Sequence, residues 1–328
     1  MVKNFGQLSS GETAHLYSLM TDMLRICVTD FGGTLVSVEV KDKSGEFVDV
    51  TLGYDDVAGY ENDNDCFGFN IGRNANRISN AQFTLNNIKY VLAKNDGENN
   101  LHSGPHLFSK RMWHVTEYRD DSIIFEIESP HLDQGFPGNA KFYIIYRITG
   151  SNSFEIEYNA VPDMDTVINM TNHSYFNLNG EGSGSIVNHK TVIHAVSFTP
   201  LKAGVIPTGE VRAVEKTPMD FRKIKRIGDD INSDYEQIKI AGGYDHNWVI
   251  DHPDSQNLAE CVEVYGDKTG IAMKISSDYP GIQMYTGNYI GNVEKTFVIN
   301  AKELNAENVT IRYIAKEVIA TNIGQFNI

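Results

Sequence analysis

Apolar and polar side chains alternate along much of the chain, and this period restricts the folds it can adopt. From Leu24 to Val28 and again from Val36 to Val40, every second side chain is apolar, with Gly32 and Gly33 between the two runs. A period of two is typical of paired β-strands. The same pattern recurs in Phe83–Leu92, Met112–Tyr118, Ile123–Ile127, Phe142–Ile148, Phe154–Tyr158, Thr166–Met170, Val192–Phe198, Trp248–Ile250, Cys261–Tyr265, Ile271–Ile275 and Val309–Tyr313.

Many short strands separated by glycine, asparagine and aspartate favour a large antiparallel β-sandwich over alternating βαβ units. The predicted class is therefore all-β. Helical periodicity is confined to two short segments, Asp55–Tyr60 and Ile227–Ile238. We find no internal repeat and no proline-rich or serine-rich linker, so we expect residues 1–328 to form a single domain.

Composition limits the partners of the chain. The formal net charge of −15 disfavours nucleic acid, and the basic run 222–226 is followed at once by acidic residues. Three widely spaced cysteines fit reduced thiols in the cytoplasm, and no apolar run is long enough to span a membrane. There is no Cys/His zinc pattern and no phosphate-binding glycine loop, so we expect no metal and no cofactor.

Four polar clusters stand between the apolar runs, at Ile71–Ile78, Asn100–Gly104, Thr171–Leu178 and Gly242–Asn247. A single histidine such as His173 is usually structural, but a group of such clusters favours a site. Together and in this order they resemble the aldose 1-epimerases, also called galactose mutarotases, with matches from about residue 32 to residue 287. The resemblance implies one large sandwich of the galactose mutarotase type, with a sugar site on a concave face.

The resemblance also implies roles for individual residues. His173 would be the general acid toward the ring oxygen, and His102 would donate a hydrogen bond nearby, both with a pKa near neutrality. Asn76 and Arg77 would hold sugar hydroxyls, and Asp245 would accept hydrogen bonds from vicinal hydroxyls. The wall of the site would be completed by Tyr175 and Gln283. Arg73 is expected to be structural, whereas Gly242 and Gly243 would let their loop approach the ligand closely.

The carboxyl-terminal segment departs from the family pattern. The family's base is a glutamate in a sequence close to Leu-Glu-x-Gln, followed shortly by Pro-Asp, and this sequence is missing here. Residues 292–328 contain no proline at all. Glu317 follows Arg312 at about the family's separation between a basic residue and the base, so it is the first candidate. Glu307 is the second candidate.

The predicted function is that of an aldose 1-epimerase, which interconverts the α and β anomers of free hexoses such as galactose or glucose. One acid and one base suffice for this reaction. The alternative is a non-catalytic carbohydrate-binding or regulatory protein that has lost its base. An epimerase of hexose 6-phosphates is disfavoured, because the clusters offer no extra arginine for a phosphate. The expected partner is a small sugar, and the expected assembly is a monomer or homodimer.

Overall fold

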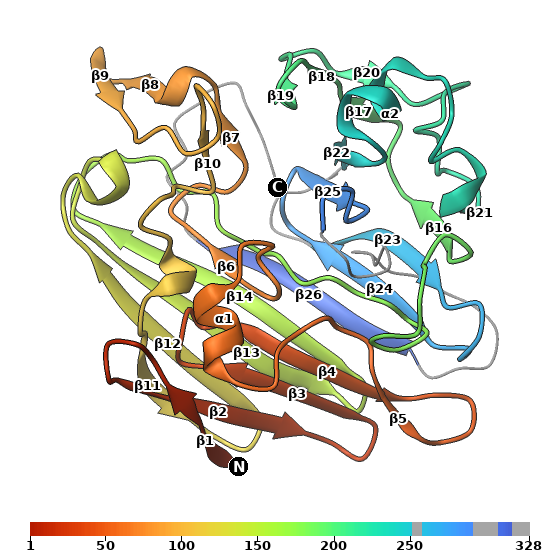
Figure 1. Ribbon diagram of the computed structural model, residues 1–328, viewed down its shortest axis with the longest axis horizontal. Helices are drawn as coiled ribbons and strands as arrows, with labels where there is room; N and C mark the ends of the chain where they lie inside the picture. Colours follow the sequence, from red (N-terminus) through yellow and green to blue (C-terminus); the bar gives the residue numbers. More distant parts are fainter. Residues whose placement is uncertain (251–257, 291–307, 317–328) are drawn as a thin grey trace.

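The computed structural model describes residues 1–250 and 258–290, together with the backbone of residues 308–316 (Figure 1). β-Strands dominate its regular structure, which confirms the predicted all-β class. Within the described residues the largest sheet has nine strands, in the order β11 (His114–Tyr118), β12 (Ser122–Ser129), β13 (Ala140–Gly150), β14 (Ser153–Pro162), β26 (Asn308–Lys316), β24 (Ala272–Ser277), β23 (Ala259–Tyr265), β16 (Lys190–Ile193) and β21 (Lys225–Arg226).

Smaller sheets accompany it. One has the order β1 (Val2–Gln7), β2 (Thr13–Met20), β3 (Leu24–Thr29), β4 (Leu35–Lys41) and β5 (Phe47–Asp49). Another has the order β20 (Arg212–Ala213), β17 (Ser197–Thr199), β22 (Asp245–Val249) and β25 (Gly281–Tyr285). The two-stranded ladders are β6 (Asn70–Ile71) with β15 (Thr171–Asn172), β7 (Arg77–Ile78) with β10 (Asn100–Leu101), β8 (Gln82–Leu85) with β9 (Ile88–Val91), and β18 (Leu201–Lys202) with β19 (Ile206–Pro207).

The two largest sheets pack face to face over a shared apolar core. On β3 the side chains of Leu24, Ile26 and Val28 are fully buried, as the alternation predicted. They belong to the same hydrophobic cluster as Phe125 of β12 and Ile144 of β13. Burying the apolar face of each sheet against the other removes it from water and stabilises the pair. This arrangement confirms the predicted sandwich.

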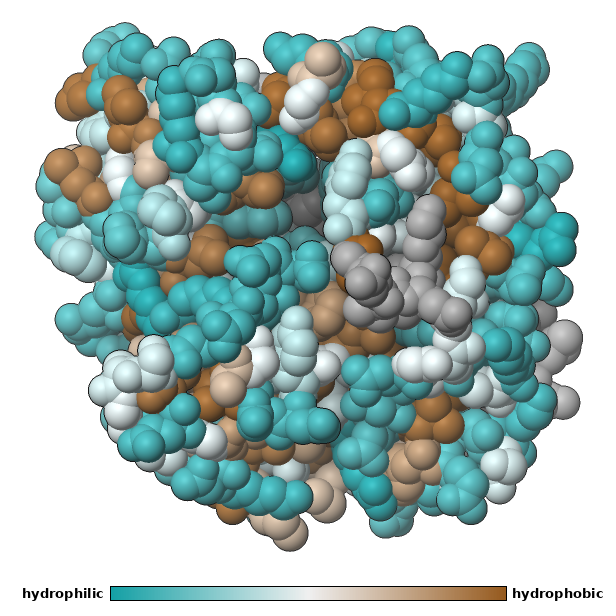
Figure 2. Space-filling view, in the orientation of Figure 1, coloured by the Kyte–Doolittle hydropathy of each residue, from teal (hydrophilic) through white to brown (hydrophobic). Residues whose placement is uncertain are grey.

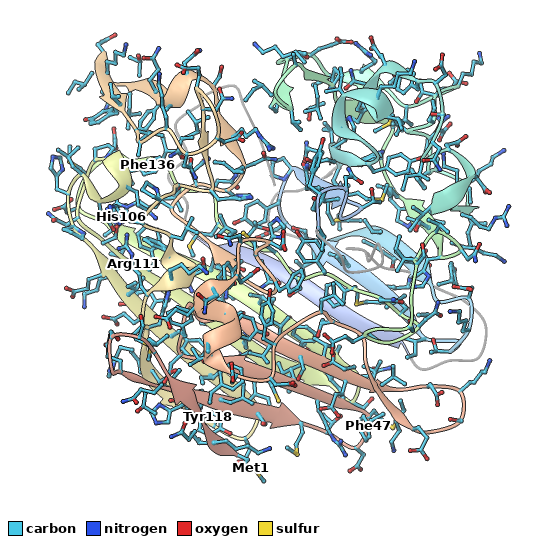
Figure 3. The ribbon with its side chains drawn as sticks, viewed as in Figure 1. Met1, Phe47, His106, Arg111, Tyr118 and Phe136 are labelled. Atoms are coloured by element: carbon cyan, nitrogen blue, oxygen red, sulfur yellow. The ribbon has the colours of Figure 1, made fainter. Side chains whose placement is uncertain are left out.

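The strand pattern predicted over Phe83–Leu92 is confirmed as the β8–β9 hairpin, with its turn at Asn86 and Asn87. The hairpin lies at the upper left of Figure 1. Asn86 and Asn87 have φ angles of 50° and 61°, in the left-handed region that two-residue hairpin turns require. Phe83 of this hairpin stacks on Phe136, which is labelled in Figure 3, and the ring centroids are 5.5 Å apart. The hairpin is thus anchored to the body of the sandwich.

Three strand predictions need correction. Thr166–Met170 forms no strand, because Asn169 bonds to the first polar cluster instead: Ala75 N–H donates to Asn169 O at 2.7 Å. Val192–Phe198 is divided between β16 and β17, since the chain passes there from the nine-stranded sheet to the four-stranded one. The third concerns β26, which pairs in parallel with both β14 and β24, whereas antiparallel pairing was expected.

Helices are short. The expected segment near residue 57 is α1 (Val57–Asn62), capped by Asp56, whose Oδ1 accepts from Gly59 N–H at 3.1 Å. The expected helix over 227–238 is instead a 3₁₀ turn at Ile227–Asp229 and a separate helix, α2 (Glu236–Ala241). Further 3₁₀ turns lie at Ser79–Ala81, Phe108–Lys110 and Asp133–Gly135. Across the described ranges no helix has the length and apolar composition needed to cross a bilayer.

Hydrophilic side chains cover much of the molecular surface on the face that Figure 2 shows.

Candidate active site

A cleft of about 300 Å³ lies where the small ladders meet the β22–β25 pair and the end of β24. Seven of the eight site residues predicted from the sequence line it, namely Asn76, Arg77, His102, His173, Tyr175, Asp245 and Gln283. They come from all four polar clusters and from β25. Residues that are up to 207 positions apart in the sequence, from Asn76 to Gln283, therefore share one cavity.

His173 enters the cleft directly after β15. Its backbone N–H donates to Phe69 O at 2.7 Å, which extends the β15–β6 pairing by one residue. The preceding Asn172 fixes the turn, since its Oδ1 accepts from both the N–H and the hydroxyl of Ser174, at 3.1 and 2.6 Å. Nδ1 of His173 is buried without a hydrogen-bond partner. Burial lowers the pKa of His173, because a low-dielectric surrounding disfavours the cationic ring.

His102 faces His173, with ring centroids 5.4 Å apart and planes at 87°. Its Nδ1 accepts a hydrogen bond from the backbone N–H of Asn76 at 2.9 Å, and a backbone N–H can only donate. The neutral ring therefore carries its proton on Nε2. Burial lowers the pKa of His102 well below its ordinary value, and the nearby His173 and Arg77 lower it further. His102 is thus a neutral hydrogen-bond donor at neutral pH.

The first and second polar clusters hold each other in place. Ser103 Oγ accepts from Asn74 N–H at 2.8 Å and donates to Asn74 O at 2.9 Å. Asn76 has a φ of 64°, a left-handed conformation that asparagine tolerates better than most residues. Arg77 Nε binds Asp96 Oδ2 at 2.7 Å, and its side chain is only 16% exposed. The guanidinium is therefore oriented before any ligand binds.

Asp245 and Gln283 share one face of the β22–β25 ladder. Asp245 is opposite Tyr285, and Gln283 is opposite Asn247 two residues further along. Gln283 Nε2 donates to Asp245 Oδ1 at 2.7 Å, which leaves the second carboxylate oxygen for other donors. Burial raises the pKa of Asp245, while Arg77 and the hydrogen bond from Gln283 act in the opposite direction.

Aromatic rings form another wall. Tyr175 is buried, and its hydroxyl donates to Asp65 O at 2.8 Å. Its ring lies 5.2 Å from that of His173 and 5.9 Å from that of Tyr285. Such rings offer an apolar surface against which the carbon-bound hydrogens of a sugar can pack.

Arg73, four residues before Arg77, lies outside the cleft. Its side chain is fully buried, and its guanidinium donates to Ser129 Oγ and to backbone carbonyls at 2.8 to 3.0 Å, including those of Pro137 and Gly138. The expectation of a structural arginine is confirmed.

The interpretation of Gly242 and Gly243 was wrong. Gly242 ends α2 with a φ of 69°, and a Cβ on Gly243 would lie 2.3 Å from Asn288 Oδ1. These glycines serve a helix end and a close packing contact, and neither lines the cleft.

The predicted base candidates, Glu317 and Glu307, both lie outside the described residues. The strand between them is described as backbone. β26 runs parallel to β24, with Tyr313 paired to Ser277, and Ser277 lines the cleft. The strand continues three residues further in the same direction and ends at Lys316. Its last residue is therefore at the cleft end of the sheet, and its first, Asn308, is at the opposite end.

Several cleft residues were missed by sequence reasoning. Asp65 and Cys66 precede the first polar cluster, and Tyr279 follows β24. Tyr285 lies within a stretch that matches the family but was given no role. Asp65 and Cys66 stand in the acidic run after α1, where the sequence carries no pattern of a sugar site. Burial raises the pKa of the Cys66 thiol to about 12, so this thiol is a weak nucleophile.

Comparisons with known proteins agree on one family. The model of the aldose 1-epimerase family matches residues 15–312. The chain is 35% identical over 292 residues to the galactose mutarotase of Bos taurus, covering 89% of this chain and 83% of that protein. It is also 35% identical over 267 residues to the aldose 1-epimerase of Escherichia coli K12, covering 81% and 76%. A crystal structure of an aldose epimerase homologue from Caenorhabditis elegans superposes with a TM-score of 0.76 at 26% identity, covering 87% of this chain and 88% of that one.

Proposed function

This chain belongs to the aldose 1-epimerase family and is an isomerase, and we propose that it interconverts the α and β anomers of free hexoses such as galactose or glucose. The observation that carries the proposal is the convergence of two histidines, an arginine and a carboxylate on one cleft. Sugar hydroxyls need donors and acceptors on several sides, and this set provides both.

In the proposed reaction a base removes the proton from the C1 hydroxyl while an acid protonates the ring oxygen. The bond between C1 and the ring oxygen breaks, and C1 becomes a carbonyl. Rotation about the C1–C2 bond then presents the other face of the carbonyl, and the reverse proton transfers close the ring. No electrons are gained or lost, and both protons are returned.

We assign the acid to His173 and a hydrogen bond to the reacting oxygens to His102. The tautomer of His102 supports its role, because its Nε2–H is the donor that the neutral ring offers. The lowered pKa of His173 differs from the near-neutral value expected from the sequence. Such an imidazolium is less populated at neutral pH but donates its proton more readily once formed.

Asn76, Arg77, Asp245 and Gln283 would bind sugar hydroxyls, and Tyr175 would pack against the ring. Glu317 stays our prediction for the base. It follows Lys316 directly, and the backbone of β26 ends at the same end of the sheet as Ser277 of the cleft. Glu307 precedes the strand at its opposite end, which makes it the weaker candidate.

A neutral hexose fits better than a hexose phosphate. Among the described residues that line the cleft, Arg77 is the permanent cation, and it is already paired with Asp96 at 2.7 Å. A phosphate would need further positive charge to offset the loss of its hydration.

Polarimetry of freshly dissolved α-galactose tests the function. We expect the folded protein to accelerate mutarotation over buffer at neutral pH. If rotation changes at the buffer rate while calorimetry still detects galactose binding, the protein is a carbohydrate-binding relative that has lost catalysis. If neither galactose nor glucose binds or turns over, the assignment of free hexoses is wrong.

A further inference from the structure

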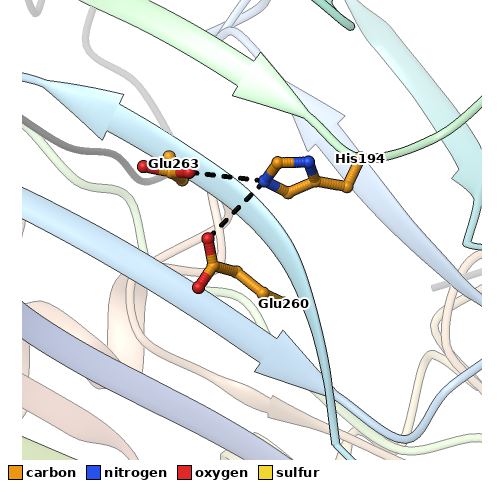
Figure 4. A group of neighbouring side chains, drawn as sticks. All are labelled: His194, Glu260 and Glu263. Carbon is orange, nitrogen blue, oxygen red and sulfur yellow. Dashed lines mark ion pairs between the residues drawn. The ribbon is translucent and has the colours of Figure 1, made fainter.

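A second group of chemically active side chains lies outside the sugar cleft. Among the described residues, His194, Glu260 and Glu263 bring three potential metal ligands within 4.8 Å of one another (Figure 4). Nε2 of His194 is 3.6 Å from Glu260 Oε1 and 3.4 Å from Glu263 Oε1. None of the three lines the sugar cleft. We propose that this group binds a divalent transition-metal ion, with Zn²⁺ as its best fit.

The backbone creates this convergence. Residues three apart on a regular strand point to opposite faces of the sheet, so Glu260 and Glu263 would normally diverge. The register of β23 against β24 shifts between Glu260 and Val262, so that β23 carries one extra residue. A β-bulge of this kind returns the two glutamates to the same face. His194 follows β16, the other neighbour of β23, and its N–H donates to Cys261 O at 2.8 Å.

The separations suit a metal better than they suit hydrogen bonds. Distances of 3.4 and 3.6 Å exceed the usual 2.7 to 3.2 Å of an N–H···O bond. In a tetrahedral zinc site, a nitrogen at about 2.0–2.1 Å and an oxygen at about 2.0–2.2 Å from the ion are separated by roughly 3.4 Å. Both nitrogen–oxygen separations are therefore close to those of such a site, and all three ligand atoms lie within 4.8 Å of one another.

Neighbouring side chains orient the two carboxylates. Lys274 Nζ binds Glu260 Oε2 at 2.6 Å, and the hydroxyl of Tyr265 lies 3.5 Å from Glu263 Oε2. Lys274 holds the second oxygen of Glu260, and the Tyr265 hydroxyl lies near the second oxygen of Glu263, while the Oε1 atoms of both glutamates lie toward the imidazole. Side chains that hydrogen-bond to the metal ligands are a regular feature of metal sites, because they fix the orientation of those ligands.

The exposure and the charge of this group also suit a divalent metal ion. His194 and Glu260 are exposed, so an ion can enter and water can take the fourth position. The two carboxylates carry two negative charges; the ammonium of Lys274 offsets part of this charge at Glu260, and a divalent ion would offset the rest. Zn²⁺ accepts this mixture of nitrogen and oxygen ligands. His194 directly follows β16, and both glutamates lie on β23. A bound ion would therefore link these two segments and stabilise the fold.

The test uses the full-length, untagged protein after dialysis against a chelator, titrated calorimetrically with zinc chloride at pH 7.5. We expect one ion per chain and a Tm increase of about 5 °C at zinc well above the Kd. His194→Ala and Glu263→Gln should each weaken binding by more than about 10-fold. His106→Ala, which alters an exposed histidine outside any such group (Figure 3), should bind zinc as the wild type does.

The conservative Glu263→Gln variant keeps the shape of the side chain, so its result stands even if His194→Ala folds poorly; circular dichroism checks both. Wild-type affinity in Glu263→Gln, or the absence of saturable zinc binding to the wild type, would overturn the proposal. In either case His194 would be only an ion-pair partner of the two glutamates. Galactose mutarotation should continue in both variants, so failure of this proposal is distinct from failure of the proposed function.

Discussion

The β1–β5 sheet and the segments that line the cleft are built in opposite ways. β2 and β4 have eight and seven residues, and from Val36 onward buried and partly buried positions alternate along β4. The cleft ladders β6–β15 and β7–β10 have two residues on each strand. Two of the cleft residues, Asn76 and His102, have φ angles of 64° and 56°. No described residue of the β1–β5 sheet lines the cleft.

The two regions are therefore stabilised by different interactions. The sheet is stabilised by apolar area removed from water, as at Val38, which is fully buried. The cleft segments are stabilised by hydrogen bonds between side chains and backbone, as between Ser103 and Asn74. Substitutions in the sheet should change stability, and substitutions at the cleft surface should change activity. The following experiments test this division.

The largest effect is expected for His173→Asn. An amide can keep a hydrogen bond but cannot transfer a proton at neutral pH, and general acid–base steps are worth roughly 10² to 10⁴ in rate. Polarimetry should show kcat lowered by at least about 100-fold. Thermal unfolding should be nearly unchanged, because the ring lies at the cleft surface. If His173→Asn retains more than about a tenth of wild-type kcat, His173 is not the general acid, and His102 becomes the next candidate.

Val38→Ala in β4 is the matched change in the sheet. It removes two methyl groups from the core and should cost about 1 to 3 kcal/mol of stability. The kcat of the folded protein should stay at the wild-type value. A loss of kcat comparable to that of His173→Asn would show that the sheet and the cleft are coupled.

The two arginines of the first polar cluster provide the next test. Arg73→Met removes the buried guanidinium and its hydrogen bonds to four backbone carbonyl oxygens, and the loss of such a buried partner costs about 3 to 5 kcal/mol. Arg77→Met removes a cleft side chain and should raise the KM for galactose about 10-fold or more, with about 1 kcal/mol or less of stability lost. Urea denaturation and initial rates measure the two effects. Equal stability losses in the two variants would contradict their different placement.

This pair also shows what the sequence can and cannot predict. The motif separated Arg73 from Arg77, and in the structure Arg73 is buried outside the cleft whereas Arg77 lines it. The alternating runs predicted the sandwich, since a period of two depends on local chain geometry alone. The parallel pairing of β26 was not predictable, because hydrogen bonding between distant strands leaves no local pattern.

Cleft residues outside the motifs were missed for a similar reason. Asp65 and Cys66 reach the cleft through the loop after α1, and only the fold brings that loop beside Tyr175. The glycines at 242 and 243 were correctly seen as special, but glycine before a site residue can serve packing as well as ligand approach. A sequence can indicate that a position requires glycine, but it does not show which residue packs against that glycine in the fold. For Gly243 this residue is Asn288.

The next prediction concerns pH at the boundary between the core and the cleft. His246 follows Asp245 on β22 but faces the core, and burial lowers its pKa to about 3. Its pKa in the unfolded chain is near 6.5, so as pH falls below that value the unfolded state gains a proton that the folded state does not. At pH 4.5 this difference destabilises the fold by about 2 to 3 kcal/mol.

Urea denaturation at pH 7 and pH 4.5 measures this contribution. His246→Asn keeps an acceptor for the Asp245 N–H, which donates to His246 Nδ1 at 3.1 Å, and it has no titrating group. The wild type should lose about 2 to 3 kcal/mol more than the variant between the two pH values, because the carboxylates titrate in both. The same pH dependence in the two proteins would show that His246 is not held neutral by burial.

The smallest effect is expected at the β8–β9 turn, which belongs to neither the apolar core nor the cleft. Asn87 has a φ of 61°, and a β-branched residue pays roughly 1 to 2 kcal/mol to adopt the left-handed conformation. Asn87→Val should therefore lower the stability by about 1 kcal/mol, and Asn87→Gly should leave it equal or raise it by a few tenths of a kcal/mol. Because the hairpin is anchored through Phe83 and Phe136, the turn can be strained while those rings stay stacked. The KM and kcat for galactose should then be unchanged in both variants. A changed KM in Asn87→Val alone would mean that the hairpin positions Arg77 in the neighbouring β7–β10 ladder. The hairpin would then have to be counted with the segments that form the site.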